Sequence, residues 1–298
     1  MYQYWGFGLH ISSEIEFPEL FPFTFEVPDV VIRLGETPKS LPGDEVTQTI
    51  NAYIKPAEYL LTMRDIGRYH VINGNQIIVE QIGNDNKSLR VFLLSNAMAA
   101  VLYQRNMIPL HASGVLYKEG VVLFSGHSRS GKSTIATSLK MKGYSVFSDD
   151  VCVLKEVDGK ILAMPSYPML KLWEDSFAKT GLSMEEAKET VRPGLAKYAH
   201  FFHHSFITDA IPVRKIFLLN TDNPLGTAEI VKPGFMEAFT EIQKNSYRPS
   251  QLNAMGKRKL FFSLASGLVN AASVYMVRRN EKADSLEQIT KEIITILS

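Results

Sequence analysis

The stretch Gly126-His-Ser-Arg-Ser-Gly-Lys-Ser-Thr134 decides how the rest of the chain is interpreted. It matches the pattern G-x-x-x-x-G-K-[ST] at every fixed position. Glycines let the backbone turn tightly enough for successive N–H groups to face one anion, and the motif adds a lysine and a hydroxyl. Apolar residues 120–124 predict a strand before the stretch, and residues 133–142 predict a helix after it. This context argues against a chance match, and we predict a phosphate-binding loop.

Each position of the loop has an expected duty. Lys132 should reach the β and γ phosphates of a nucleotide, and Ser133 should offer its hydroxyl to Mg²⁺. The helix that follows points its positive end at the same anion. The sequence therefore predicts ATP and Mg²⁺ as ligands. The residues predicted to bind them are Gly126, His127, Ser128, Arg129, Ser130, Gly131, Lys132, Ser133 and Thr134.

Two adjacent carboxylates, Asp149 and Asp150, follow a predicted buried strand over residues 144–147. A carboxylate at such a strand end commonly holds Mg²⁺, and a second one can accept a proton from an attacking hydroxyl. Neighbouring residues on a regular strand point in opposite directions, so both can serve one site only if the chain turns there. The alternative interpretation is that the two aspartates lie in a solvated turn without a function. The predicted phosphate-binding loop upstream argues against it.

The stretch from Leu110 to Asp150 resembles the catalytic core of the bacterial HPr kinase/phosphorylase family. The parts come in the same order: the histidine of Leu110-His-Ala-Ser113, a hairpin, the phosphate loop, a Lys-Gly pair and a double aspartate. The resemblance implies an α/β, phosphoenolpyruvate-carboxykinase-like nucleotide fold and phosphorylation of a protein serine. It implies that Asp150 takes the hydroxyl proton and that His111 orients it. Asp149 would support the metal and Lys132.

The sequence departs from this family at two places. Arg129 stands where the loop usually has glycine, and residues 164–173 contain no glutamate to supply a further metal ligand. No basic segment for phosphorolysis is recognised. These departures argue against phosphorolysis, in which inorganic phosphate removes the transferred phosphoryl group. They also argue against HPr itself as the acceptor. Members of that family form hexamers, but no motif in this sequence predicts a hexamer. Whether the chain forms an oligomer is left open.

The opening residues 4–20 resemble HPr-kinase-like proteins of Gram-positive bacteria, some of which phosphorylate the C-terminal serine of a lasso-peptide precursor. This narrower resemblance implies a peptide acceptor. The alternatives are a kinase of a free small molecule, such as an amino acid, and a nucleotide-binding regulator without transfer activity.

Two parts of the chain differ in pattern. Residues 1–90 carry frequent prolines and short apolar runs, including strands at 59–63 and 68–80 with an Asn73-Gly74 turn, and predict a small β-rich domain. It is a candidate for acceptor recognition. Residues 91–298 predict the kinase domain, entered through a helix over 91–105. Within it, Ser183-Met-Glu-Glu186 has capping-box spacing and predicts the start of a helix.

Composition limits the partners. The 32 basic and 31 acidic residues leave a formal net charge of +1, which gives no electrostatic case for nucleic acid or an anionic membrane. No apolar run approaches the roughly 18 residues that span a bilayer. Cys152 is the single cysteine, so no disulfide forms within the chain, and a cytoplasmic location is expected. The histidines at 200, 203 and 204 lack a recognisable ligand pattern and favour a structural role.

Overall fold

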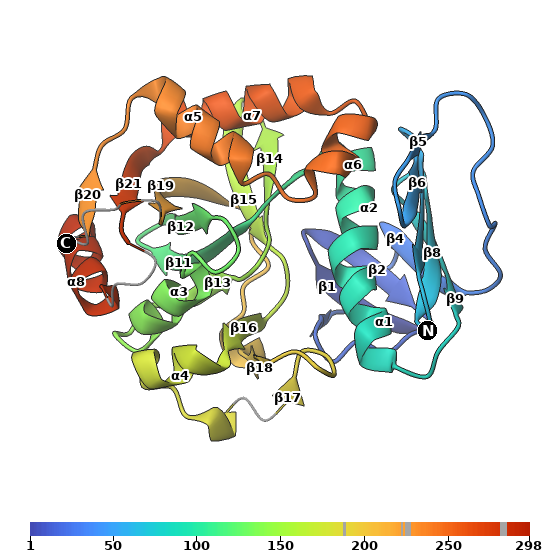
Figure 1. Cartoon of the computed structure of the whole chain (residues 1–298), viewed down its shortest axis with the longest axis horizontal. Helices are drawn as coiled ribbons and strands as arrows, with labels where there is room; N and C mark the ends of the chain where they lie inside the picture. Colours follow the sequence, from blue (N-terminus) through green and yellow to red (C-terminus); the bar gives the residue numbers. More distant parts are fainter. Residues whose placement is uncertain (187–188, 222, 224–227, 281–284) are drawn as a thin grey trace.

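The computed structural model describes residues 1–186, 189–221, 223, 228–280 and 285–298. Within these ranges the chain is a mixed α/β protein with three sheets. Figure 1 shows the N-terminal sheet on one side, a long helical segment beside it, and the sheet that carries the phosphate loop beyond. In the same ranges, no helix combines the length and the apolar character needed to cross a membrane.

The N-terminal sheet combines hairpins with one strand, Val30–Leu34, that pairs in parallel with the strands on both sides of it. Asn73 and Gly74 both adopt positive φ, +51° and +66°, and lie in the predicted turn between neighbouring strands. The connection is three residues long instead of the predicted two, because Ile72 pairs with Gln76. The predicted strands at 59–63 and 68–80 are confirmed. In spatial order the strands are β3 (Phe21–Pro22), β1 (Tyr2–Gly6), β2 (Leu9–Ser13), β4 (Val30–Leu34), β9 (Gln76–Gln81), β8 (Gly67–Ile72), β7 (Glu58–Met63), β6 (Ala52–Ile54) and β5 (Thr47–Gln48).

The connecting helix is longer than predicted. It runs through α1 (Asn86–Phe92), a π-helical stretch η1 (Leu93–Ala97) and α2 (Met98–Gln104). It begins before Val91 because the Asp85 carboxylate accepts a hydrogen bond from the Ser88 N–H at 3.0 Å and caps the first turn. Its second half is buried all round, as expected for a helix packed on both sides.

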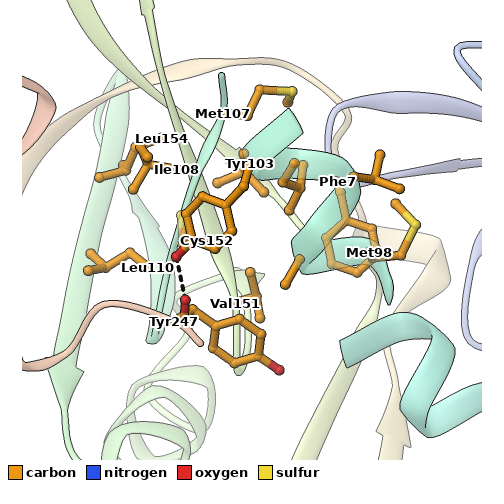
Figure 2. Packing of buried hydrophobic residues seen from close by; sticks show 14 of the residues in the cluster. Phe7, Met98, Tyr103, Met107, Ile108, Leu110, Val151, Cys152, Leu154 and Tyr247 are labelled. Carbon is orange, nitrogen blue, oxygen red and sulfur yellow. Dashed lines mark hydrogen bonds between the residues drawn. The ribbon is translucent and has the colours of Figure 1, made fainter. Parts of the chain in front are cut away.

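One hydrophobic core joins the N-terminal sheet to the rest of the molecule. Phe7, Met98 and Cys152 belong to the same buried cluster, although they come from the N-terminal segment, the helix and the second sheet. Figure 2 shows them around Tyr103, whose hydroxyl donates a hydrogen bond to the Tyr247 carbonyl. Cys152 is fully buried, as its apolar strand predicts. The division at residue 90 stays a prediction, and the core is shared across it.

Tyr103→Phe is expected to lower the free energy of unfolding by about 1–3 kcal/mol, because it leaves the buried Tyr247 carbonyl without its donor. Urea titration measures the change. Tyr144→Phe is the control, since the structure gives the half-buried Tyr144 hydroxyl no hydrogen bond among the described residues. Equal stability of wild type and Tyr103→Phe would show that this hydrogen bond does not stabilise the fold.

The second sheet carries the predicted phosphate loop, residues 126–134, at its centre. β12 (Gly120–Gly126) pairs with β11 (Ala112–Tyr117) as the predicted antiparallel hairpin and with β19 (Ile211–Asn220) in parallel. β19 also pairs in parallel with β21 (Ser273–Arg278). A further hairpin turns at Asp158-Gly159. The strands are β10 (Ile108–Leu110), β14 (Cys152–Val157), β15 (Lys160–Pro165), β19 (Ile211–Asn220), β12 (Gly120–Gly126), β11 (Ala112–Tyr117), β13 (Val146–Ser148), β21 (Ser273–Arg278) and β20 (Glu229–Val231).

Helices cover both faces of this sheet. Val121 and Leu123 of β12 belong to the large core, whereas Val122 and Phe124 belong to a second cluster, so the strand is buried on both sides. The second cluster includes residues of α3 (Lys132–Lys140) and α8 (Leu286–Leu297). The opposite face packs against α5 (Phe235–Lys244) and α7 (Arg258–Ala271), with α6 (Pro249–Ala254) between them in sequence.

A third, small sheet was not predicted. It consists of β16 (Met169–Trp173), β18 (Lys197–Phe201) and β17 (Glu189–Thr190), with α4 (Glu174–Thr180) following β16. The helix predicted to begin at Ser183 is wrong over the described residues. Only a 3₁₀ turn, η2 (Met184–Glu186), forms there, because the Ser183 hydroxyl accepts from the N–H of Glu185, two residues on, and makes a local turn. A second 3₁₀ turn is η3 (His203–Ser205).

Candidate nucleotide and phosphoryl-transfer site

The two glycines of the loop stand at positions that disfavour any side chain, Gly126 for lack of space and Gly131 because of its backbone conformation. A Cβ at Gly126 would lie 2.6 Å from the Ser130 Oγ and 2.8 Å from the Leu219 carbonyl oxygen. Gly131 has φ +97° at the start of α3, a backbone conformation that favours glycine. The strand, loop and helix therefore follow one another as the pattern predicts. Arg129 also takes a positive φ of +69°.

The Arg129 side chain does not enter the loop. Its guanidinium lies over the Trp173 ring, 4.7 Å from the centroid. The neighbouring loop residues are held by other elements: His127 Nε2 lies 2.6 Å from Thr221 Oγ1, and the Ser130 carbonyl accepts from Arg279 at 3.0 Å. Contacts from several elements thus hold the loop in place.

Lys132 is folded back onto the loop. Its ammonium donates to the carbonyls of Gly126 and His127, both at 2.8 Å. Burial lowers the pKa of Lys132 to about 8, against the opposing effect of the negative charges of Asp150 and Asp149. The side chain carries a cation at neutral pH, close to the carbonyls that begin the loop. It lines the same cavity as Ser128, Ser133 and Thr134.

Asp149 is buried behind Ser133. Its Oδ1 accepts from Ser133 Oγ at 2.7 Å and from Ser113 Oγ at 2.6 Å, and its Oδ2 accepts from the backbone N–H of Lys171 at 2.8 Å. The predicted metal residues, Ser133 and Asp149, are therefore in direct contact. Oxygen ligands of this kind suit Mg²⁺, which is usually bound by one or two carboxylates together with substrate phosphates. In the described part of the chain, no group of three or more His, Cys, Asp or Glu side chains could hold a metal ion.

Asp150 turns back into the cavity. Its φ of +66° breaks the strand geometry, so the two adjacent aspartates do not point to opposite faces of a sheet. Its Oδ2 lies 2.7 Å from Lys171 Nζ, and its Oδ1 lies 3.7 Å from His111 Nε2. Burial alone would raise the pKa of Asp150, but the charges of Lys171 and Lys197 outweigh it and hold that pKa well below its usual range.

His111 lies between Asp150 and Tyr247. Its ring meets the Tyr247 ring edge to face at 5.9 Å, and its carbonyl accepts from Ser125 Oγ at 3.1 Å. Burial and the charge of Lys132 lower the pKa of His111 to about 4, against the opposing charge of Asp150. At neutral pH the imidazole is therefore uncharged, and its contact with Asp150 is between a neutral ring and a carboxylate.

Stability should depend on pH through His111. Between pH 6.5 and about 4 the unfolded chain binds a proton at this residue and the folded chain does not, so folding weakens as the pH falls through this window. Over that window, the free energy of unfolding of wild type is expected to fall by up to about 3 kcal/mol more than that of His111→Gln. Chemical denaturation at both pH values checks this. Parallel pH curves for the two proteins would contradict it.

The site residues converge on one cavity of about 510 Å³. It is lined by the loop from Ser128 to Thr134, by His111 and Asp150, and by Leu286 and Ile289 of α8. Gly126, His127 and Asp149 do not line it, but they accept hydrogen bonds from Lys132 and Ser133, which do. Its walls carry more cations than anions. The cationic side chains are Arg129, Lys132, Lys171, Lys179, Lys197 and Arg279, and the carboxylates are Asp150 and Asp175.

Lys171 is the functional candidate that sequence reasoning missed. It sits in the apolar run Met169-Leu-Lys-Leu-Trp173, and only about 9% of its side chain is exposed. A lysine inside a buried apolar strand is unusual unless it is paired, and this is the signal that could have found it. The histidines at 200 and 203 face different partners, the Lys140 ammonium and the Leu20 carbonyl.

No protein-family model matches the chain, and no curated protein matches it. Among solved structures, the chain is similar to the Hpr(Ser) kinase/phosphatase from Coxiella burnetii, with 12% identity and a TM-score of 0.31. The alignment covers 63% of this chain and 89% of that one. A likeness of this size assigns no family and no activity to this chain.

Proposed function

We propose that the chain is an ATP-dependent kinase that transfers the γ-phosphoryl group to a serine hydroxyl of a peptide or small protein. The C-terminal serine of a lasso-type precursor is one candidate acceptor. The observation that carries the proposal is the hydrogen bond from Ser133 Oγ to Asp149. Ser133 lines the same cavity as the buried Lys132 and as Asp150. This set of groups can bind a polyphosphate, hold its metal and accept a proton.

The roles follow from where each group lies. Lys132 would leave the loop carbonyls and neutralise the β and γ phosphates, with the loop amides and the start of α3. Ser133 and Asp149 would hold Mg²⁺, which, when bound, supplies positive charge to the phosphates. The cation-rich wall suits a polyanionic substrate, because opposite charge raises both affinity and the rate of encounter.

Asp150 would receive the proton of the acceptor. As the serine oxygen forms its bond to the γ phosphorus, the bond between that phosphorus and the β–γ bridging oxygen breaks, ADP leaves, and the hydroxyl proton moves to the carboxylate. Oδ2 already accepts from Lys171, so Oδ1 on the His111 side is the oxygen available for this proton. A carboxylate with a low pKa can do this because phosphoryl transfer needs little proton removal before the transition state.

Intact-mass analysis tests the proposal directly. The purified protein is incubated with Mg-ATP and one acceptor at a time: HPr, a lasso-type precursor peptide, the same peptide without its serine hydroxyl, or free serine. A phosphoryl mass gain that needs the hydroxyl and is absent with Lys132→Ala supports the kinase. Gain on free serine alone indicates a small-molecule kinase. Tight ATP binding without gain on any acceptor favours a nucleotide-binding regulator.

A further inference from the structure

Lys171 contacts both aspartates of the candidate site. Its backbone N–H binds Asp149 and its ammonium binds Asp150, so one residue of β16 contacts both carboxylates. The ammonium also lies 5.4 Å from the centroid of the Tyr167 ring. These contacts and its burial leave the side chain little freedom. It nevertheless lines the cavity together with Lys132 and Ser133.

The position of Asp150 determines what Lys171 can reach. To accept a proton from the attacking hydroxyl, Asp150 must lie within about 3 Å of that oxygen, which itself stands about 3 Å from the phosphorus. Lys171 Nζ is 2.7 Å from the other oxygen of the same carboxylate. Its ammonium therefore lies beside both the carboxylate and the group in transfer. An ionised aspartate next to a polyphosphate is repulsive, and a cation between them removes that repulsion.

We propose that Lys171 is a catalytic residue whose ammonium bridges Asp150 and an oxygen of the γ-phosphoryl group as it is transferred. This assignment rests on the proposed function and names a further residue of the same site. Lys132 would neutralise charge on the nucleotide side, and Lys171 would neutralise charge on the acceptor side. Such a cation acts most strongly in the transition state, where negative charge on the transferring group meets the incoming oxygen.

Binding of a phosphoryl mimic tests Lys171 without any acceptor. The affinity for Mg-ADP is measured by calorimetry with and without aluminium fluoride, which imitates the transferring group. Wild type is expected to bind more tightly with the mimic. Lys171→Met should keep Mg-ADP affinity within about threefold and lose most of this tightening, about 100-fold. Lys171→Arg should restore part of it. Lys155→Met, an exposed lysine of β14, is the matched control.

A second pair of variants separates the phosphoryl contact from the Asp150 contact. Removing Lys171 leaves the Asp150 carboxylate without its cationic partner and can unfold the protein. Lys171→Met is therefore also combined with Asp150→Asn, and the double variant is compared with Asp150→Asn alone. The double variant should again lose the tightening. Equal tightening with and without Lys171, or no tightening in wild type, overturns the assignment.

The same data separate the two proposals. If wild type does not bind Mg-ADP at all, the proposed function fails and the role of Lys171 fails with it. If the tightening depends on Lys171 while no acceptor gains a phosphoryl group, the role of Lys171 stands and the proposed serine acceptor fails.

Discussion

Replacing Lys132 with alanine is expected to abolish measurable binding of Mg-ATP, with a loss of at least about 100-fold in affinity. The ammonium lies at the start of the loop, 2.8 Å from each of two carbonyl oxygens. Burial already lowers its pKa to about 8, so a nearby polyphosphate both keeps it charged and gains from its charge. Alanine removes this cation from a largely desolvated position, where a charged contact is strong.

Calorimetric titration with Mg-ATP measures this loss. Lys142→Ala, an exposed lysine just beyond α3, is the control for a general change in charge and should bind as wild type does. Circular dichroism establishes that the variant is folded, since the lost hydrogen bonds to the loop also affect local stability. Undiminished affinity in folded Lys132→Ala would refute the phosphate loop.

Asp150→Asn is expected to separate binding from transfer. Asparagine has the shape of aspartate and can still accept from Lys171, so the cavity keeps its form. It cannot hold the hydroxyl proton, and phosphoryl transfer should fall roughly 10²–10⁴-fold. Affinity for Mg-ATP should stay within about threefold of wild type or increase, because one negative charge beside the phosphates is removed.

Single-turnover transfer to the acceptor found by mass analysis measures the rate, and calorimetry measures the affinity. Asp158→Asn is the matched control, since Asp158 is exposed in the turn between β14 and β15 and has positive φ, which asparagine tolerates. A fully active Asp150→Asn would remove Asp150 from the proposed chemistry, while loss of both binding and transfer would indicate a structural role.

Much of the fold was predictable because short-range signals govern it. The strand, loop and helix around Gly126 to Thr134 and the turn at Asn73-Gly74 appear where the sequence predicts them. In each case glycine or a turn residue determines the backbone within a few positions. The connecting helix was predicted too short, because its beginning depends on the Asp85 cap and its length on burial from both sides.

The small sheet of β16, β18 and β17 could not be predicted from local sequence signals. Its strands are short, and β16 pairs with β18 across a segment that contains α4 and a 3₁₀ turn. The capping-box spacing at Ser183 suggested a helix there, but a serine hydroxyl can serve a tight turn as well as a helix start. Only the packed structure decides between these two uses of the same side chain.

For the site, the sequence by itself determined the loop and its glycines, the lysine and serine that follow, and the adjacent aspartates. These groups are neighbours along the chain or at the ends of adjoining strands, so their chemistry can be inferred from spacing. Tertiary structure decided that Asp150 turns into the cavity and that Lys171, 21 residues away, meets its carboxylate. The reason is physical: that contact depends on how two sheets pack together, and no local sequence pattern specifies such packing.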